Sequence, residues 1–500
     1  MSIPFIEDND QTVARRQHLE ALRELVGNVY PNKFQRSEVV ELGKEDTISS
    51  VMEKFHDFQP QEELNKFVVR LAGRIASPPR VMGKAAFVHL SDGVSRLQIY
   101  IRKADAVGVR NDAGGGEADG WAIFQQLDHG DFIGVEGFLF VTRTGELSVH
   151  VQKLQFLSKA LLPLPDKMHG IHDPEIRQRQ RYADLIAGSL KHEKDDALTP
   201  REVFERRAEA VKELRRILED HGYIEVETPM LTPLPTGAAA RPFKTHHNAL
   251  DIDLYARIAP ELYLKRLLVG GFEKVYELNR NFRNEGISSR HNPEFTMLEF
   301  YWAYADVNSM MDFCEEMLRA VIFKVLGHTH VQFGEHSIDF GSPFRRIGME
   351  ESLGGSVPPE QITNDRVLTL FEEHVEPGLI QPTFITNFPK PISPLSKASP
   401  ANPHVAERFE LYVAAMELAN GFSELNDPEE QYERFRDQVR QRESGDEEAM
   451  LMDEDYIRAL SYGMPPAAGI GIGIDRLVML LTNRSSIRDV ILFPHMRPKD

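Results

Sequence analysis

The sequence has 500 residues, enough for roughly two to four domains, and its 41 % hydrophobic and 27 % charged residues are typical of a soluble globular protein. No apolar run approaches the length of a membrane span, and the acidic N-terminus does not resemble a signal peptide, so we expect no membrane association. The net charge of −19 argues against DNA binding but leaves structured RNA open. The single cysteine, Cys314, excludes an internal disulfide and a cysteine-rich zinc site, and it favours a reducing, cytoplasmic compartment.

The first 65 residues are predicted to form a helical extension. Leucines recur at helical spacing within residues 11–35, among arginines and glutamates, and the pattern ends near Gly27 and Pro31. One interpretation is an arm that contacts RNA. The other, which the sequence alone favours, is a solvated helix that packs on its own domain.

Between residues 66 and 160 the periodicity changes to two, which is typical of β-strands. Short strands bounded by glycine-bearing turns are predicted at residues 67–75, 86–90, 97–101, 131–137 and 147–151. Five such strands favour a small closed barrel, with an OB-fold as the leading candidate. OB-folds stack single-stranded bases on aromatic rings and read base edges with polar groups. The candidates for this role are Phe87 and Gln98, with Arg80, Lys84 and Glu146 at the rim. The alternative for each, favoured by the sequence alone, is a core ring or an ordinary surface group.

Two segments have the composition of loops and linkers. Asn111–Gly120 is rich in glycine and predicts a flexible insertion between two barrel strands. After the barrel come Leu162–Pro165 and a predicted linking helix over Asp173–Ile186. We therefore expect a linker over residues 161–198 and a second domain from residue 199 to the end.

The second domain opens with a predicted helix and strand. Thr199–Glu202 is a capping box with proline at the first helical position. The helix is expected to end at His221–Gly222, and a strand over Tyr223–Pro229 is expected to follow it. The residues that we expect this helix to bury are Phe204, Ala208, Val211, Leu214 and Leu218.

Two short segments precede the central part of this domain. Gly237–Phe243 consists largely of small residues and suits close approach of the backbone to a ligand. Arg257–Lys265 begins a helix with Glu261 in its first turn, a position that the helix dipole alone would explain.

Val275–Trp302 is predicted to be two strands joined by a long polar loop. One face of the second strand carries Phe295, Met297, Glu299 and Tyr301, and the other carries Thr296, Leu298, Phe300 and Trp302. The loop gathers Arg283, Arg290 and His291 beside Glu285. Cations bind phosphates, a ring stacks on a base, and a carboxylate accepts from an amine. This combination favours a nucleotide site over the alternative, a solvated surface hairpin.

Glutamates recur seven residues apart in the segment Glu407–Glu424. On an uninterrupted strand Glu410 and Glu417 would point in opposite directions, so we expect a bulge or bend near Val413 that brings them together. Two converging carboxylates suit magnesium, which commonly uses one or two of them plus substrate phosphates. The alternative, a set of solvated glutamates, fits poorly with their apolar neighbours.

Gly469–Arg476 is a glycine-rich passage from strand to helix. Its spacing is GxGxGxxR rather than GxGxxG, and no βαβ unit surrounds it, so it does not match a dinucleotide fingerprint. Glycine at every second position clears one face of a strand, so a flat purine and its sugar fit against the backbone. Arg476 follows at the start of the helix, where it can meet a terminal phosphate.

These segments resemble the signature motifs of class II aminoacyl-tRNA synthetases. Phe282–Glu285 (FRNE) matches the core of the second motif, and Arg290–Thr296 is similar to the branch that contains the lysyl, aspartyl and asparaginyl enzymes. The helix and strand that end at Pro229 resemble the first motif, and the glycine-rich strand with Arg476 resembles the third. The motifs occur in the family's order, and the resemblance extends from the barrel to Arg497–Pro498. Within the branch the chain looks like the bacterial-type lysyl enzymes.

The resemblance implies an α+β catalytic domain over residues 199–500, with a mixed, mainly antiparallel sheet flanked by helices, after an N-terminal all-β OB-fold barrel that binds the anticodon. It implies a ligase that activates L-lysine with ATP to lysyl-adenylate and pyrophosphate and then transfers lysine to the 3′ end of tRNA(Lys). The implied cofactor is Mg²⁺, and the implied partners are tRNA(Lys), ATP, L-lysine and a second copy of the chain bound through the first motif. Neither a membrane nor DNA is expected as a partner.

The resemblance also implies roles for individual residues. Arg283 and Arg476 are the expected catalytic residues, holding the α- and γ-phosphates, and no protein nucleophile is needed. The expected ATP-binding residues are Arg283, Glu285, His291, Asn292, Phe295, Gly473 and Arg476. The expected lysine-binding residues are Gly237, Glu261, Arg283, Glu299, Tyr301, Asn420 and Glu424. The expected magnesium ligands are Glu410 and Glu417, and the expected anticodon-binding residues are Arg80, Phe87, Gln98 and Glu146.

Two other functions remain open at this stage. A relative that attaches lysine to a protein would resemble the catalytic domain but lack the barrel. A non-catalytic, RNA-binding descendant would have lost some of the motif residues, all of which are intact here. The chain departs from many relatives at Thr236, Ala415 and Met416, where glycine, glycine and a basic residue are common. These departures put the tightness of the magnesium and lysine sites in question.

Overall fold

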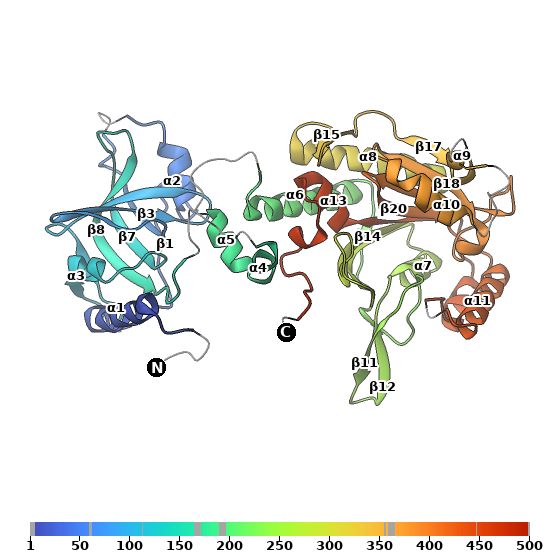
Figure 1. Ribbon diagram of the computed structural model, residues 1–500, viewed down its shortest axis with the longest axis horizontal. Helices are drawn as coiled ribbons and strands as arrows, with labels where there is room; N and C mark the ends of the chain where they lie inside the picture. Colours follow the sequence, from blue (N-terminus) through green and yellow to red (C-terminus); the bar gives the residue numbers. More distant parts are fainter. Residues whose placement is uncertain are drawn as a thin grey trace. The chain divides into compact units, whose positions relative to one another are not determined.

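The structure is a computed structural model that describes residues 6–59, 63–112, 114–164, 171, 173–189, 197–354, 357–358, 366–446 and 448–498. The chain divides into two compact units, Met1–Arg201 and Glu202–Asp500, which are coloured from blue to green and from green to red in Figure 1. No helix of the described residues has the length and apolar character needed to cross a membrane.

The first unit is built on a closed five-stranded barrel. β1 pairs with β7, β7 with β8, β8 with β4, β4 with β3, and β3 returns to β1. The five strands are β1 (Val68–Ile75), β3 (Ala85–Ser91), β4 (Arg96–Arg102), β7 (Phe132–Val141) and β8 (Leu147–Ser158). Each predicted strand is present. Their alternating burial places one set of side chains in the barrel core, as the period of two requires.

The N-terminal helix packs on this barrel. α1 (Asp10–Val26) begins with a capping box at Asn9 and ends at Gly27, near the predicted end. Its buried leucines belong to the same hydrophobic core as the barrel strands. Arg15 donates to the carbonyl oxygens of His129 and Ala160 at 3.0 and 2.7 Å. The interpretation of α1 as a helix packed on its own domain is therefore confirmed. The short helix α2 (Ile48–Phe55) joins the same core.

Two expectations about the connecting segments need correction. The glycine-rich segment Asn111–Gly120 contains β6 (Glu117–Asp119), which pairs with β5 (Val107–Val109), and β5 in turn pairs with β8. Asp119 then caps α3 (Gly120–Gln125). The segment is therefore partly ordered by strand pairing, although residue 113 lies outside the described residues. The predicted single linking helix is two helices, α4 (Pro174–Arg179) and α5 (Arg181–Ser189), interrupted at Gln180. The barrel also carries β2 (Arg80–Met82), paired with β3.

The second unit contains an eight-stranded sheet in the order β17-β18-β19-β20-β21-β14-β13-β9. All neighbours are antiparallel except the outermost pairs, β17 with β18 and β13 with β9. This sheet confirms the expected mixed, mainly antiparallel architecture. Its strands are β9 (Ile224–Glu225), β13 (Lys274–Phe282), β14 (Glu294–Ala303), β17 (Arg345–Gly348), β18 (Thr383–Pro389), β19 (Val405–Val413), β20 (Met416–Ser423) and β21 (Ala467–Gly473).

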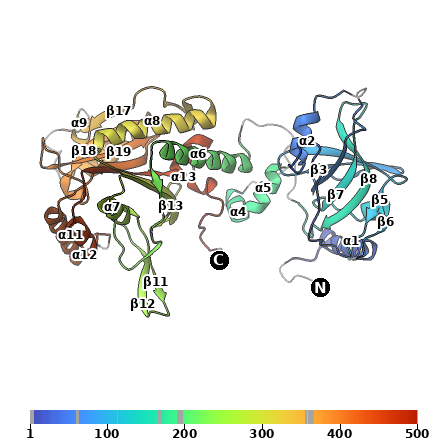
Figure 2. The same cartoon turned by 180° about the vertical axis from the view of Figure 1, so that it is seen from behind.

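Helices cover both faces of this sheet. Figures 1 and 2 show α6 (Pro200–Asp220) and α8 (Val307–Leu326) on one side and α7 (Glu261–Val269) on the other. α13 (Ile474–Thr482) continues directly from β21 and packs against β14 and β20. The remaining helices are α9 (Met349–Leu353), α10 (Val367–His374), α11 (Pro428–Glu443) and α12 (Glu454–Leu460), with single 3₁₀ turns at Glu376–Gly378, Lys390–Ile392 and Ile487–Asp489.

Two small sheets complete the unit. β10 (Leu231–Thr232), β12 (Ile252–Ala256) and β11 (Phe243–His247) form one, and β15 (His330–Phe333) and β16 (His336–Asp339) form the other. Helix α6 presents a slightly different face from the predicted one, because Ala208 is exposed whereas Val203, Ala210 and Ile217 are buried. Cys314 is buried in α8.

Candidate active site

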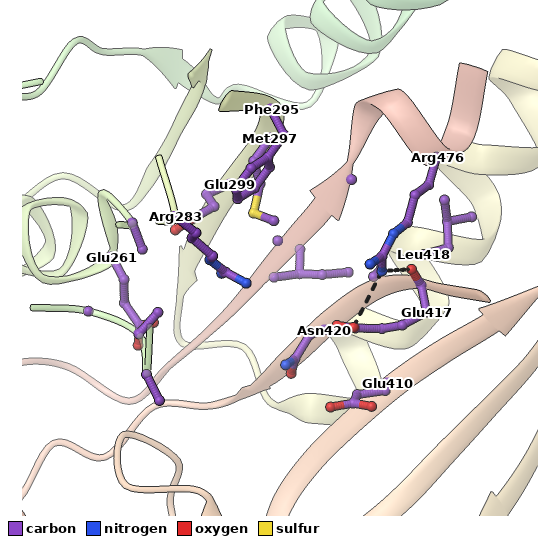
Figure 3. A pocket seen from close by; sticks show the side chains of 18 of the residues that line it. Glu261, Arg283, Phe295, Met297, Glu299, Glu410, Glu417, Leu418, Asn420 and Arg476 are labelled. Atoms are coloured by element: carbon purple, nitrogen blue, oxygen red, sulfur yellow. Dashed lines mark hydrogen bonds and ion pairs between the residues drawn. The ribbon is translucent and has the colours of Figure 1, made fainter. Parts of the chain in front are cut away.

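The second unit holds a cavity of about 420 Å³ above the middle strands of its sheet (Figure 3). Nearly all of the site residues predicted for this domain line it, although they come from segments more than two hundred residues apart. Those that line it are Gly237, Glu261, Arg283, Glu285, His291, Asn292, Phe295, Glu299, Tyr301, Glu410, Glu417, Asn420, Gly473 and Arg476. The exception, Glu424, is fully buried behind the lining.

The hairpin of β13 and β14 supplies one wall. Its register places Glu277 opposite Glu299 and Asn281 opposite Phe295. The predicted face of Phe295, Met297, Glu299 and Tyr301 lines the cavity. Arg283 lies just after β13, with its guanidinium carbon 5.2 Å from the centre of the Phe295 ring. The Nε of Arg283 is buried and has no hydrogen-bond partner in the described part of the chain, so it is available to a ligand.

The loop between these strands is held by its own polar contacts. Ser288 Oγ lies 2.9 Å from Nδ1 of His291, and the amide N–H of His495 donates to Oδ1 of Asn292 at 3.2 Å. Nε2 of His291 lies 3.4 Å from Nη2 of Arg476. Burial and the neighbouring Arg476 guanidinium lower the pKa of His291, which favours the neutral imidazole. The exposed carboxylate of Glu285 lies at the rim of the cavity.

Strand β21 forms the floor between β14 and β20. A Cβ added at Gly473 would meet no atom closer than 3.7 Å, so this end of the strand is open to a ligand. A Cβ added at Gly469 would instead clash with Oε1 of Glu424 and the ring of Tyr301. The alternating glycines therefore have two uses: Gly473 clears space for a ligand, and Gly469 lets buried side chains approach the backbone.

Arg476 projects from the first turn of α13 toward β20. It donates to the carbonyl oxygen of Glu417, and its Nη1 lies 3.4 Å from Oε2 of the same residue, as the dashed lines in Figure 3 mark. The adjacent Asp475 fixes the helix start, because it accepts from the backbone N–H of Thr296 at 2.8 Å and from Arg207 at 2.6 Å.

The acidic segment is a hairpin of β19 and β20. The turn falls at Ala414 and Ala415, both at positive φ, and the register shifts between Leu411 and Tyr412. The expected bend is confirmed and is a turn combined with a bulge. It brings Glu410 and Glu417 to the same cavity although they lie on different strands (Figure 3).

Glu410 is the more buried of these two carboxylates. The hydroxyl of Tyr412 donates to it at 2.6 Å, and Arg408 forms an ion pair with it. Burial raises the pKa of Glu410 to about 7; Arg408 opposes this rise, and the nearby Glu417 adds to it. Two neighbouring carboxylates are a suitable donor pair for a divalent cation. The described residues contain no cluster of three or more metal-ligating side chains, so such a cation would need further ligands from the substrate.

A second group of carboxylates lies at the α7 end of the cavity. Glu261, Glu299 and Glu424 are all buried, and the hydroxyl of Tyr301 donates to Oε2 of Glu299 at 3.2 Å. Burial raises the pKa of Glu299 to about 8, with a further rise from neighbouring Glu261. Buried carboxylates without matching cations are unfavourable, so this end of the cavity suits a ligand that carries positive charge.

Several residues of the site were not predicted from the sequence. Lys265 lies between Glu261 and Glu424, and Arg408 beside Glu410. Both had a signal in the sequence: Lys265 follows Glu261 by four residues on a predicted helix, and Arg408 precedes Glu410 by two on a predicted strand. Tyr456 and Phe422, which also lie beside Lys265, had no such signal.

The first unit brings its own candidate residues together on the barrel surface. Gln98 donates to Glu146 at 2.7 Å, and Arg80 pairs with Phe87 across β2 and β3. The ring centre of Phe87 lies 4.7 Å from that of Tyr100. His89, 2.7 Å from Glu146, and Tyr100 were not predicted, although each follows a chosen residue at a spacing of two on its strand.

Each of the two units matches a known protein family. Residues 173–497 match the model of "tRNA synthetases class II (D, K and N)", and residues 69–157 match "OB-fold nucleic acid binding domain". The chain belongs to the class II tRNA synthetases, and its barrel is an OB-fold.

Close relatives cover the chain almost completely. It is 47 % identical to "Lysine--tRNA ligase" of Photorhabdus laumondii, over 98 % of this chain and 97 % of the relative. It is 48 % identical to "Lysine--tRNA ligase" of Coxiella burnetii, over 99 % and 98 %, and 47 % identical to "Lysine--tRNA ligase, heat inducible" of Escherichia coli, over 99 % and 97 %.

Proposed function

We infer that the chain is a lysine–tRNA ligase, which activates L-lysine with ATP and transfers it to the 3′ end of tRNA(Lys) for translation. The observation that carries this inference is the cavity with cationic groups for phosphates at one end and three buried carboxylates at the other. The end rich in carboxylates suits an amino acid with a basic side chain and disfavours aspartate, whose side chain would need cations.

ATP is proposed to bind at the end that Arg283 and Arg476 flank. Arg283 would hold the α-phosphate and Arg476 the γ-phosphate, with Phe295 stacked on adenine and Glu285 accepting from its amino group. His291, Asn292 and Gly473 complete the proposed ATP site. The free Nε of Arg283 and the open face of Gly473 support this assignment.

Lysine is proposed to bind at the opposite end, with its α-amino group at Glu261 and its ε-ammonium near Glu299, Tyr301 and Glu424. Gly237 and Asn420 complete this site. Arg283 would meet the carboxylate of lysine, one oxygen of which attacks the α-phosphorus as the bond to pyrophosphate breaks. The 3′-terminal ribose hydroxyl of tRNA then attacks the carbonyl carbon, and AMP leaves. Positioning and electrostatic stabilisation supply the rate enhancement.

Glu410 and Glu417 are proposed to hold Mg²⁺ together with ATP phosphates. The raised pKa of Glu410, caused first by burial and then by nearby Glu417, supports a site that gains from a cation. A bound Mg²⁺ would neutralise phosphate charge during adenylate formation. The residues of the chain orient and bind the two substrates around it.

The remaining parts of the function concern larger partners. Arg80, Phe87, Gln98 and Glu146 of the OB-fold are proposed to bind the anticodon. The first motif, α6 with β9, is proposed to form a homodimer, which is consistent with the exposed Ile224 on the edge strand of the sheet. A cytoplasmic location is proposed because translation takes place there.

The test is amino-acid-dependent exchange of pyrophosphate into ATP, with each of the twenty amino acids supplied separately in the presence of magnesium. Exchange with lysine alone is expected. Exchange with aspartate or asparagine would contradict the assignment of the amino-acid pocket but not of the family. Absence of exchange with every amino acid, from folded protein, would contradict the proposed activity and favour a non-catalytic RNA-binding role.

A further inference from the structure

Lys265 is a buried cation at the centre of the carboxylate end of the cavity. The exposed fraction of its side chain is 0 %, and its Nζ donates to Oε1 of Glu261 at 2.6 Å and forms an ion pair with Oε2 of Glu424. Nζ also lies 5.2 Å from the centre of the Phe422 ring. Burial by itself lowers the pKa of Lys265, but Glu261 and Glu424 more than compensate and raise it above its ordinary value. The two carboxylates therefore favour the charged form of Lys265.

The contacts of Lys265 leave one side of Glu424 free. Its Oε2 forms an ion pair with Lys265, its Oε1 is buried, and neither oxygen accepts a hydrogen bond from a described residue. Oε1 lies against Gly469, which lines the cavity, because a Cβ at that glycine would clash with it. The ion pair with Lys265 thus orients Glu424 so that its Oε1 lies against Gly469, in the strand that forms the floor of the cavity.

The net negative charge of this pocket is equal in size to the positive charge of the two ammonium groups of lysine. When Glu261, Glu299 and Glu424 are all ionised, as they would be around a bound cationic ligand, their three charges and the one ammonium of Lys265 leave two negative charges. Lysine carries two ammonium groups, and its single carboxylate is assigned to Arg283. Without Lys265 the pocket would keep one carboxylate that no substrate group could neutralise, which is costly in a buried site.

We propose that Lys265 is a positioning residue that sets the charge of the amino-acid pocket to the two ammonium groups of the substrate and orients Glu261 and Glu424 to receive them. This proposal rests on the proposed function. It concerns selectivity for lysine rather than the chemical step, because Lys265 does not line the cavity and touches no expected position of a reacting atom.

The charged and titratable groups around Lys265 come from several elements. They are Glu261 on α7 itself, Glu299 and Tyr301 on β14, Glu424 after β20, Tyr456 on α12, Arg408 on β19 and the Arg257–Glu277 pair beside β13. Among the described residues, Lys265 is the one cation of this set that contacts Glu424. Its removal is therefore not compensated by another cation at that carboxylate.

The experiment compares the KM for lysine in pyrophosphate exchange across pH 6–9 for the parent protein and Lys265→Met, a neutral side chain of similar length. In Lys265→Met a carboxylate must stay protonated when lysine binds. We expect the KM for lysine to rise about tenfold or more while the KM for ATP changes little. The pH at which the lysine KM begins to rise on the acidic side should move upward by about one unit or more. Lys274→Met, a lysine of the same unit outside the cavity, is the matched control and should leave the pH profile unchanged.

A double variant separates charge from packing. Lys265→Met combined with Glu424→Gln again leaves two negative charges, so its pH profile should return toward that of the parent even if its KM stays high. A single variant with the parent's pH profile, or a double variant displaced further than the single one, would overturn the proposal. Parent protein that shows no exchange with lysine would instead overturn the proposed function.

A measurement on the unmodified protein covers the case in which Lys265→Met does not fold. Calorimetry in buffers of different ionisation enthalpy counts the protons released when lysine or norleucine, which lacks the ε-amine, binds. The charge match predicts that norleucine binding releases about one proton fewer than lysine binding near neutral pH. Equal proton release for the two ligands would contradict the charge match.

Discussion

Glu299 is a carboxylate whose surroundings disfavour its charged form. It is buried on β14, and burial, with a smaller contribution from Glu261, raises its pKa to about 8 from an ordinary 4.5. The hydroxyl of Tyr301 is the group that donates to it. Such a side chain binds a proton in the free protein and gives it up when a cationic ligand arrives, so the same group links ligand binding, stability and pH.

The first prediction concerns this link. The pKa of Glu299 is raised in the folded protein. Between about pH 4.5 and 8 its carboxyl group is therefore protonated in the folded protein and ionised in the unfolded chain. The stability contributed by this proton is complete below pH 4.5 and is lost as pH rises through 8. Glu299→Gln cannot lose this proton, so its free energy of unfolding should not show the loss. The free energy of unfolding of the variant minus that of the parent should therefore increase by on the order of 2–4 kcal/mol from pH 5 to pH 9.

Urea denaturation of ligand-free protein at several pH values measures this difference. Glu335→Gln, a change of an exposed glutamate in the β15–β16 turn, serves as the control and should run parallel to the parent. A constant offset between Glu299→Gln and the parent at every pH would show that Glu299 is ionised in the free protein.

At the scale of elements, the acidic hairpin contains a turn that its residues tolerate poorly. Ala414 and Ala415 have φ of 52° and 55°, in the left-handed region where a Cβ costs roughly 1–2 kcal/mol per residue. The turn is held by backbone bonds from Ala414 and Ala415 to Ile380 and Leu379. It matters because it sets the positions of Glu410 and Glu417.

The second prediction is that Ala415→Gly stabilises the protein by about 1 kcal/mol, since glycine adopts this conformation without a steric cost. Equilibrium unfolding in urea tests it. Ala406→Gly, on the same hairpin but in extended β19, is the matched control and should destabilise. A loss of stability in Ala415→Gly would show that the turn is not strained.

The third prediction compares two glycines of β21. Gly469→Ala forces a methyl group against Glu424 and Tyr301, so the lysine KM in pyrophosphate exchange should rise about a hundredfold. Gly473→Ala places the same methyl group in open space, where ATP is proposed to lie, so the ATP KM should rise instead. If both variants raised the same KM, the division of the cavity into two ends would be wrong.

At the scale of the whole molecule, each unit has its own core and its own candidate site. The barrel core contains side chains of α1, α2 and the five barrel strands, and the sheet of the second unit is packed separately. The proposed ATP and lysine sites lie in the second unit, whereas the proposed anticodon site lies on the OB-fold.

The fourth prediction follows from this division of labour. Phe87→Ala removes a ring on which a base can stack, so the KM for tRNA in aminoacylation should rise by about tenfold to a hundredfold. Lysine-dependent pyrophosphate exchange in the absence of tRNA should change less than about twofold. Filter assays of charged tRNA and exchange assays on the same preparation give both numbers. Equal losses in the two assays would indicate that Phe87 supports the fold rather than the anticodon site.

Local patterns were sufficient for much of this protein. The five barrel strands, the β13–β14 hairpin with its two faces, and the passage from β21 to α13 follow from periodicity and from the placement of glycine and proline. The motif residues Arg283, Glu285, Glu410, Glu417 and Arg476 were also recognisable, because their identities and spacing along the chain carry the resemblance to the family. The need for a bend between Glu410 and Glu417 followed from strand geometry alone.

Only the tertiary structure decided which charges meet. Lys265 and Glu424 are far apart in the sequence and belong to different elements, so no local pattern pairs them, yet they form a buried ion pair. The exposed Ala208 and the break at Gln180 likewise did not follow from periodicity. The sequence specified short-range geometry and the chemical groups of the site; long-range packing, which excludes water and brings distant charges together, decided their partners and their protonation.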